Sequence, residues 1–148
     1  MPAKSTAVQP ARTGTSLKAK DIMEQPVIAA TPQASLRDVA TQLVTNEFSG
    51  MPVAAPDGKV VGIITESDII RALILGKKPE NLTAGDVITD SPITVDADAP
   101  LEDVMKSLED HRIVRVPVTS ENTLTGIISR RDVIRAILEP EFMAFGEF

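Results

Sequence analysis

Two pairs of a hydroxyl residue and an aspartate recur in this chain with the same spacing. Thr65 precedes Asp68 by three residues in "GIITESDII", and Ser129 precedes Asp132 by three residues in "GIISRRDVI". A hydroxyl and an acid placed this way before an apolar run often cap a helix start. The same geometry can bind a nucleotide, because a helix start attracts phosphate and a carboxylate can accept both hydrogen bonds of a ribose diol. The pattern leaves both interpretations open.

Each pair lies inside a longer repeat. In both copies, apolar residues at helical spacing come first and predict a helix with one buried face. The tripeptide "MPV" or "VPV" follows, and an apolar stretch then ends at the hydroxyl residue. The residues of the predicted helix faces are Leu36, Val39, Ala40, Leu43 and Val44 in the first copy, and Leu101, Val104, Met105 and Leu108 in the second.

Local signals delimit the elements of each copy. Ser35 with Asp38 is typical of a capping box, and the turn "PDG" predicts a hairpin of two short strands. A last helix follows each hydroxyl–aspartate pair, and we expect Gly76 to end the first and Pro140 to end the second. The fold class is therefore α/β (α+β), with a small sheet flanked by helices in each copy.

The repeats predict the domain organisation. A unit of about 60 residues buries only about 60% of its unfolded surface, so we expect the two copies to pack as one pseudo-symmetric body. The expected segments are a disordered tail rich in Pro, Ala, Ser and Thr, two repeats, and a C-terminal tail rich in Phe. Their bounds are 1–17, 18–78, 79–140 and 141–148. A transit peptide is an alternative for the first segment.

Composition narrows the classes of protein. The chain is 43% hydrophobic and 24% charged, as in globular proteins, and has no cysteine. It has no apolar run long enough to span a membrane, so we expect a cytoplasmic protein. The net charge is −6, and residues 1–20 carry four basic residues and no acid, which leaves −10 for residues 21–148. Such an acidic body argues against general nucleic-acid binding.

The two copies resemble a tandem pair of CBS domains, named after cystathionine β-synthase and called a Bateman module. The resemblance rests on "x-P-V", a strand and "G-h-h-[ST]-x-x-D" (h apolar), present twice in register over about residues 18–139. It implies two repeats related by a pseudo-twofold axis, with two clefts between them. Family clefts commonly bind AMP, ADP or ATP, and sometimes S-adenosylmethionine or NAD-type compounds. The resemblance also implies a homodimer.

The resemblance further implies which residues bind the ligand. The hydroxyl and the aspartate of each motif would hold the ribose, and the opposite repeat would supply contacts to the base. One cleft would join Ser129, Asp132 and Ile127 to Ile28, Ser49 and Met51, and the other would join Thr65, Asp68 and Ile63 to Thr94, Val114 and Val116.

The two predicted sites differ in charge. Two residues before "PV", where some family members place a phosphate-binding basic residue, the second copy has Arg115 and the first has Gly50. Arg130 and Arg131 also follow Ser129, although they are equally typical of a solvated helix face. We therefore expect the second site to bind the more highly charged nucleotide, and more tightly.

Other residues that could carry chemistry have structural interpretations. His111 near a helix end is typical of a surface or capping residue, and the acid pairs at 102–103 and 109–110 are typical of exposed helix faces. No metal-ligand spacing, nucleophile with a matched base, Rossmann motif or P-loop is found, so neither an enzyme nor a metal site is expected. Phe142, Phe145 and Phe148 could form one stripe that packs on the body or on a dimer mate, or that docks on another protein.

The sequence as a whole predicts a regulatory module that senses adenine nucleotides, requires no cofactor and signals to a separate effector protein. The chain outside the repeats is short, which is why we expect the output to pass to another protein. A structural adaptor for dimerisation or docking, with non-functional clefts, is the alternative. A nucleic-acid binder, based on the basic N-terminal segment and the arginines between Arg112 and Arg135, is a third possibility.

Overall fold

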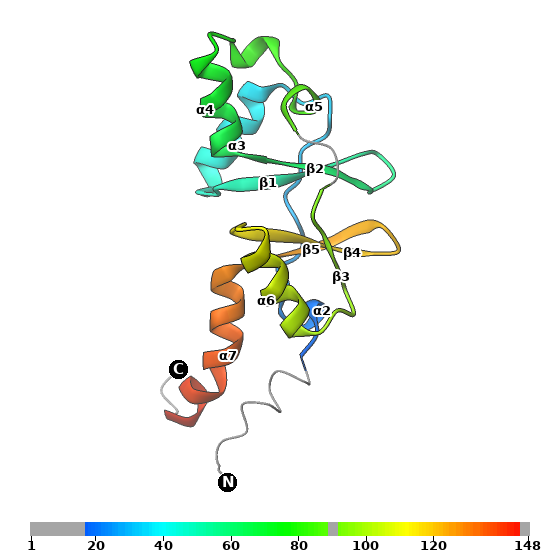
Figure 1. Cartoon of the computed structure of the whole chain (residues 1–148), viewed down its shortest axis with the longest axis vertical. Helices are drawn as coiled ribbons and strands as arrows, with labels where there is room; N and C mark the ends of the chain where they lie inside the picture. The colour runs from blue at the N-terminus through cyan, green and yellow to red at the C-terminus, as the bar shows by residue number, and fades with distance from the viewer. Residues whose placement is uncertain (1–16, 89–91, 146–148) are drawn as a thin grey trace. The chain divides into compact units, whose positions relative to one another are not determined.

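The computed structural model describes residues 17–88 and 92–145. These residues form two compact units (Figure 1). Unit 1 takes its described residues from Met1–Gln25, Thr94–Val118 and Gly126–Phe148, and unit 2 consists of Pro26–Ile93 and Thr119–Thr125. Each unit therefore combines segments from both halves of the sequence. The domain bounds predicted from the repeats are bounds of the sequence copies, and they stay predictions.

Unit 2 contains a two-stranded antiparallel hairpin with helices on one side of it (Figure 1). Strand β1 pairs with β2 so that Gly50 lies opposite Thr65 and Met51 opposite Ile64. This confirms the predicted hairpin. The elements are α3 (Leu36–Asn46), β1 (Gly50–Ala54), β2 (Val60–Thr65), α4 (Glu66–Ile74), the 3₁₀ helix η1 (Pro79–Asn81) and α5 (Ala84–Val87).

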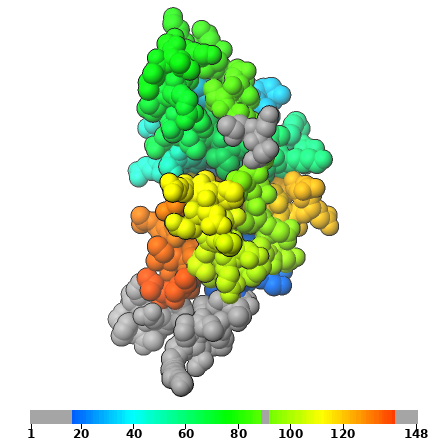
Figure 2. All heavy atoms as spheres, viewed as in Figure 1, coloured from blue at the N-terminus to red at the C-terminus, as the bar shows by residue number. Residues whose placement is uncertain are grey.

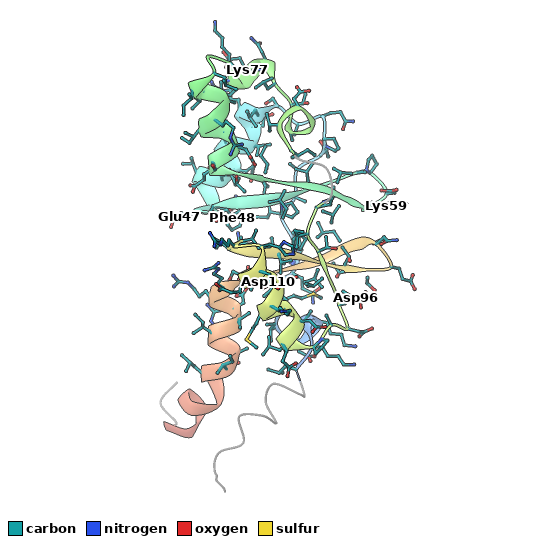
Figure 3. All side chains as sticks on the ribbon, in the orientation of Figure 1. Glu47, Phe48, Lys59, Lys77, Asp96 and Asp110 are labelled. Carbon is teal, nitrogen blue, oxygen red and sulfur yellow. The ribbon has the colours of Figure 1, made fainter. Side chains whose placement is uncertain are left out.

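A side-chain cap marks the start of helix α3, and a residue with left-handed backbone marks its end. The hydroxyl of Ser35 accepts a hydrogen bond from the amide of Asp38 at 3.0 Å, which is one of the two bonds of the predicted capping box. The helix ends at Glu47, whose φ of 57° is left-handed, as is common just beyond the last helical turn. The chain then turns through Phe48 into β1, and Figure 3 labels both residues at this junction.

The buried face of α3 is narrower than its sequence pattern predicts. Leu36, Val39 and Leu43 are buried and Ala40 is partly buried, but Val44 is 79% exposed. Leu36, Val39 and Leu43 lie three or four residues apart on one stripe that packs on the hairpin, and Val44 lies beside it. The prediction was therefore correct for four of these five residues and wrong for Val44.

Unit 1 repeats the central order of a helix, two strands and a helix in α6, β4, β5 and α7. Its three-stranded sheet has the order β3–β4–β5, and Figure 1 shows α2, α6 and α7 on one side of that sheet. Leu101, Val104 and Leu108 of α6 are buried, as their spacing predicts. The elements are α2 (Ala19–Ile22), β3 (Val95–Asp96), α6 (Leu101–Asp110), β4 (Arg115–Ser120), β5 (Thr123–Ser129) and α7 (Arg130–Phe145).

The first described segment, residues 17–25, is an integral part of unit 1. The amide of Ala19 donates to the carbonyl of Ala99 at 2.8 Å. Glu24 pairs with Ile127 of β5 through two backbone hydrogen bonds of 2.8 and 3.1 Å. Unit 2 uses the equivalent segment of the second copy, since the amide of Ala84 donates to the carbonyl of Ala34 at 2.8 Å. Each unit thus packs the opening segment of the opposite copy.

Helix α7 is longer than predicted, and the expected end at Pro140 is wrong. The helix runs from Arg130 to Phe145. Proline removes one backbone hydrogen bond from a helix interior and tends to bend it, but it does not always end it. The predicted stripe of Phe142, Phe145 and Phe148 concerns side chains outside the described residues, as does the predicted disorder of the N-terminal segment before Leu17. By contrast, α4 ends before Gly76 as expected, and Gly76 has a φ of 79°.

Within the described ranges, none of the helices has the length and apolar character needed to cross a bilayer. The cytoplasmic location stays a prediction.

Gly126 provides a test of how residues 17–25 are held. A Cβ atom at Gly126 would lie 2.6 Å from Cγ and 2.9 Å from Cβ of Met23. We therefore expect Gly126→Ala to lower the free energy of unfolding by about 1–3 kcal/mol, the usual cost of overpacking. Urea unfolding followed by circular dichroism would measure it, because the chain has neither Trp nor Tyr. Adding Met23→Ala should reduce the loss caused by Gly126→Ala, and equal stability of Gly126→Ala and wild type would contradict the close packing.

Candidate functional site

The second hydroxyl–aspartate pair forms the junction between β5 and α7 in unit 1. The amide of Ser129 donates to Oδ2 of Asp132 at 2.9 Å, and the amide of Asp132 donates to Oγ of Ser129 at 3.1 Å. Asp132 is only 4% exposed and is the one charged residue among the buried residues of the described chain. The junction is thus a reciprocal helix cap built around a buried carboxylate.

The first pair forms the same junction between β2 and α4 in unit 2. The amide of Thr65 donates to Oδ2 of Asp68 at 2.9 Å, and the amide of Asp68 donates to Oγ1 of Thr65 at 3.2 Å. The Thr65 hydroxyl also donates to Oδ2 of Asp68 at 3.0 Å. The capping interpretation therefore holds in both copies.

An arginine one turn further along each helix binds the same carboxylate. Nη1 of Arg135 lies 3.1 Å from Oδ1 of Asp132, and Nη1 of Arg71 lies 3.0 Å from Oδ1 of Asp68. Sequence reasoning missed these partners, although "DIIR" and "DVIR" repeat the spacing in both copies. A carboxylate has about four acceptor positions, so Asp132, with two hydrogen bonds, keeps capacity for a ligand's hydroxyl groups.

The strand that starts each hairpin supplies a carbonyl to the helix start. The amide of Glu66 donates to the carbonyl of Ser49 at 2.9 Å, and the amide of Arg130 donates to the carbonyl of Val114 at 3.0 Å. Nε of Arg130 also donates to the carbonyl of Ile113 at 2.9 Å. These bonds favour a structural role for Arg130 and place two predicted site residues, Ser49 and Val114, at the two helix starts.

Arg115 lies in β4 of unit 1 with its side chain only 15% exposed, and its Nη2 lies 3.5 Å from Oε1 of Glu24. Backbone pairing with Ile127 fixes the position of Glu24 beside β5. Sequence reasoning missed Glu24, since the repeat pattern does not mark it. We call Glu24, Arg115, Asp132 and Arg135 the charge cluster of unit 1.

The charge cluster changes the acidity of Glu24. Burial raises the pKa of Glu24 above its usual value, and the hydrogen bond and negative charge of Asp132 raise it further. The positive charges of Arg115 and Arg135 oppose this increase in pKa without cancelling it. The two carboxyl groups therefore lie close enough to influence each other, and the charged form of Glu24 is less favourable than that of a solvated glutamate.

Unit 2 cannot hold an arginine at the equivalent position without rearrangement. Gly50 occupies that position and lies opposite Thr65. A Cβ atom there would lie 3.0 Å from the carbonyl oxygen of Ile64 and 3.2 Å from Cγ2 of Thr65. The difference in charge between the two copies is therefore built into the packing of the hairpin.

The predicted wall residues have different environments. Met51 and Val116 are 2% and 0% exposed, so their side chains pack inside their own units. The side chain of Ile127 is also buried, whereas Ile28 and Val114 are 42% and 52% exposed. The remaining predicted residues are partly buried (Ile63 and Thr94) or exposed (Ser49 and Arg131). The predicted pairing of Ser129 with Ile28, Ser49 and Met51, and of Thr65 with Thr94, Val114 and Val116, joins residues of different units and stays a prediction.

The remaining candidates have structural roles. His111 is exposed and caps the end of α6, and its amide donates to the carbonyl of Ser107 at 3.2 Å, as predicted. The acid pairs at 102–103 and 109–110 are exposed, also as predicted. Among the residues that the structure describes, no group of three or more His, Cys, Asp or Glu side chains could hold a metal ion.

Comparison with protein families agrees with this architecture. The model of the CBS domain matches residues 19–75 and again residues 84–139. The chain belongs to the CBS domain family. The resemblance stated from the two sequence copies is confirmed, and so is the α+β fold of two CBS repeats.

Known CBS proteins cover most of this chain. Hypoxic response protein 1 from Mycobacterium tuberculosis is 32% identical over 128 residues, which are 86% of this chain and 90% of that protein. The CBS domain pair of protein MJ0100, solved with 5-methylthioadenosine and S-adenosyl-L-methionine, has a TM-score of 0.73 and 30% identity, over 84% of this chain and 98% of the other. The CBS domain protein PAE2072 from Pyrobaculum aerophilum, complexed with AMP, has a TM-score of 0.74 and 27% identity. The match covers 86% of this chain and 99% of the other.

The raised pKa of Glu24 predicts how stability depends on pH. A carboxyl group with a raised pKa in the folded state stabilises fully below its unfolded value, and this stabilisation is lost as the pH rises through the folded value. At pH 7 the charged Glu24 therefore lowers stability. We expect Glu24→Gln to raise the melting temperature at pH 7. The gain in free energy of unfolding should be at most about 1 kcal/mol, because the side chain is half exposed.

Melting temperatures across a pH series, followed by circular dichroism, would measure this effect. The gain should shrink as the pH falls through the raised pKa of the folded protein, and it should be absent below 4.5, the usual pKa of a glutamate. Glu102→Gln, which removes an exposed acid of α6, controls for the loss of one negative charge. A lower melting temperature of Glu24→Gln at pH 7 would contradict the prediction.

Proposed function

We propose that this CBS protein is a regulatory module that binds an adenosine-containing ligand at its hydroxyl–aspartate helix starts and transmits the signal to a separate protein. The observation that carries the proposal is the buried carboxylate of Asp132 at the start of α7. A buried carboxylate is costly unless it is bonded, and here two protein donors leave it capacity for a diol.

The geometry at this helix start suits a nucleoside. Oδ1 and Oδ2 of Asp132 each have one protein donor, so both oxygens can accept the two adjacent hydroxyls of a ribose. The Ser129 hydroxyl can bond the sugar or a phosphate. Arg115 supplies a positive charge in the same unit, and charge-assisted hydrogen bonds to phosphate are the stronger kind.

The comparisons support the choice of ligand class. The similar domain pair of MJ0100 was solved with two adenosine compounds, and the similar PAE2072 was solved with AMP. AMP, ADP and ATP are our first candidates for this chain, followed by S-adenosylmethionine and NAD-type compounds. No cofactor is required in this proposal, and the chain is not proposed to catalyse a reaction.

The site of unit 1 is proposed to prefer the more highly charged nucleotide. Arg115 provides its positive charge, whereas in unit 2 a side chain at Gly50 would crowd the carbonyl of Ile64 and the methyl group of Thr65. Thr65 also uses its hydroxyl to donate to Asp68, so the unit 2 carboxylate already accepts three hydrogen bonds. Both differences favour the Ser129–Asp132 site for a phosphorylated ligand.

A thermal-unfolding panel tests the proposed function. We expect AMP, ADP or ATP to raise the melting temperature, because a ligand at 100 times its Kd stabilises by about 2.7 kcal/mol. S-adenosylmethionine and NADH would be compared, with guanosine nucleotides as controls. Asp132→Ala should weaken ADP binding by about tenfold or more, and more than Asp68→Ala, because charge-assisted bonds are lost.

Asp86→Ala is the matched control for this panel. Asp86 caps α5 by accepting a 2.8 Å hydrogen bond from the amide of Thr83. It belongs to neither of the two hydroxyl–aspartate motifs that form the proposed sites. Its loss should lower stability without changing ligand affinity. No response to any nucleotide would leave the adaptor as the better explanation, and equal effects of Asp132→Ala and Asp68→Ala on ADP would reject the proposed difference between the sites.

The protein is also proposed to form a homodimer, since both units expose large apolar side chains on α4 and α7, the helices that follow the hydroxyl–aspartate pairs. On α4, green at the surface in Figure 2, Ile70, Leu73 and Ile74 are 54%, 49% and 78% exposed. On α7, Ile134 and Ile137 are 57% and 44% exposed. Residues spaced this way share a helix face, and covering them would remove apolar surface from water.

Sedimentation velocity tests the dimer. We expect wild type to sediment as a dimer and Ile74→Glu to shift the population towards monomer, because a charge would have to be buried at the interface. Val44→Glu is the matched control, since Val44 of α3 is equally exposed at 79% but lies outside the two last helices. A monomeric wild type, or an equal loss of dimer in both variants, would contradict the proposed interface.

A further inference from the structure

Arg115, the residue proposed to attract phosphate, already has an anionic partner inside its own unit. Nη2 of Arg115 lies 3.5 Å from Oε1 of Glu24. Only 15% of the Arg115 side chain is exposed, so its charge depends on nearby anions more than that of a solvated arginine does. A phosphate that bound Arg115 would have to share it with Glu24 or replace Glu24.

Of the two acids in the charge cluster, Glu24 is the one that can leave more easily. Its side chain is 50% exposed, so its carboxylate can turn into water at small cost. Asp132, by contrast, has a side chain that is 3% exposed and is held by the Ser129 amide and by Arg135. The raised pKa of Glu24 points the same way, since burial and Asp132 disfavour its charged form.

The backbone of Glu24 keeps this anion close to the site whatever its side chain does. Two hydrogen bonds pair Glu24 with Ile127, two residues before Ser129 in β5. If the carboxylate stays, it occupies Arg115; if it leaves, the ion pair with Arg115 is lost. Both cases weaken binding of a phosphorylated ligand more than binding of a ligand without phosphate.

We propose that Glu24 is a specificity-determining residue, which competes with ligand phosphate for Arg115 and so sets how strongly the unit 1 site prefers AMP over adenosine. This inference rests on the proposed function, because it assumes an adenosine ligand at the Ser129–Asp132 helix start. It goes beyond that function by assigning a role to a residue outside the repeated motif.

Isothermal titration of the full chain with AMP and with adenosine tests the role of Glu24. Glu24→Gln keeps the size of the side chain and removes its charge. It should tighten AMP binding by about three- to tenfold, the range expected for loss of one partly exposed competing ion pair, and change adenosine affinity less. Glu102→Gln removes an exposed charge from α6 of the same unit and should change neither affinity.

A second pair of variants shows whether Glu24 acts through Arg115. In an Arg115→Gln background, Glu24→Gln should no longer tighten AMP binding, because the contested cation is absent. Circular dichroism would establish that each variant folds. A gain that persists in this background, equal changes for AMP and adenosine, or the same gain in Glu102→Gln would overturn the role of Glu24 while leaving the proposed function intact.

Failure of the proposed function has a different signature. If neither AMP nor adenosine binds wild type, Glu24→Gln or Arg115→Gln, the adenosine site itself is rejected, and the inference about Glu24 falls with it. Binding of adenosine with no selective effect of Glu24→Gln rejects the inference alone.

Discussion

The hydrogen bond from the Ser129 amide to the Asp132 carboxylate is the interaction on which the candidate site depends. It fixes the residue at which β5 becomes α7, and its counterpart at Thr65 and Asp68 does the same between β2 and α4. A strand that passes directly into a helix would otherwise leave amides without partners. The same carboxylate that completes the fold is the group proposed to bind a ligand, so in this proposal structure and binding depend on one side chain.

The two units use this junction with different electrostatics. In unit 1 the buried carboxylate of Asp132 lies among two arginines and a second acid, so the charges nearly balance. In unit 2, Asp68 has Arg71 as its cation, and the backbone at Gly50 closes the position that Arg115 occupies in unit 1. Duplication has thus preserved the geometry of the helix start while the surrounding charge has diverged. If both helix starts bind ligands as proposed, their different charges favour two related ligands rather than one ligand bound twice.

Local patterns made much of this structure predictable. The cap at Ser35 and the reciprocal caps at the two helix starts each join residues three positions apart. Contacts at so short a separation can be predicted from the spacing of residues in the sequence. Glu24 was not predictable, because it reaches the site through pairing with a strand about 100 residues away. Val44 is exposed because of how α3 is oriented against the hairpin. The continuation of α7 beyond Pro140 depends on the surroundings of the helix. Neither is set by local spacing.

The exchange of opening segments has a consequence for the order in which the chain acquires its structure. Unit 2 draws most of its residues from one continuous stretch, Pro26–Ile93. Unit 1 needs residues 17–25 from the beginning of the chain and α7 from its end. On the ribosome, the strand edge that Glu24 pairs with is made about 100 residues after Glu24 itself, and closing so long a loop is entropically slow. The unit that carries the charge cluster is therefore the last to be completed during synthesis.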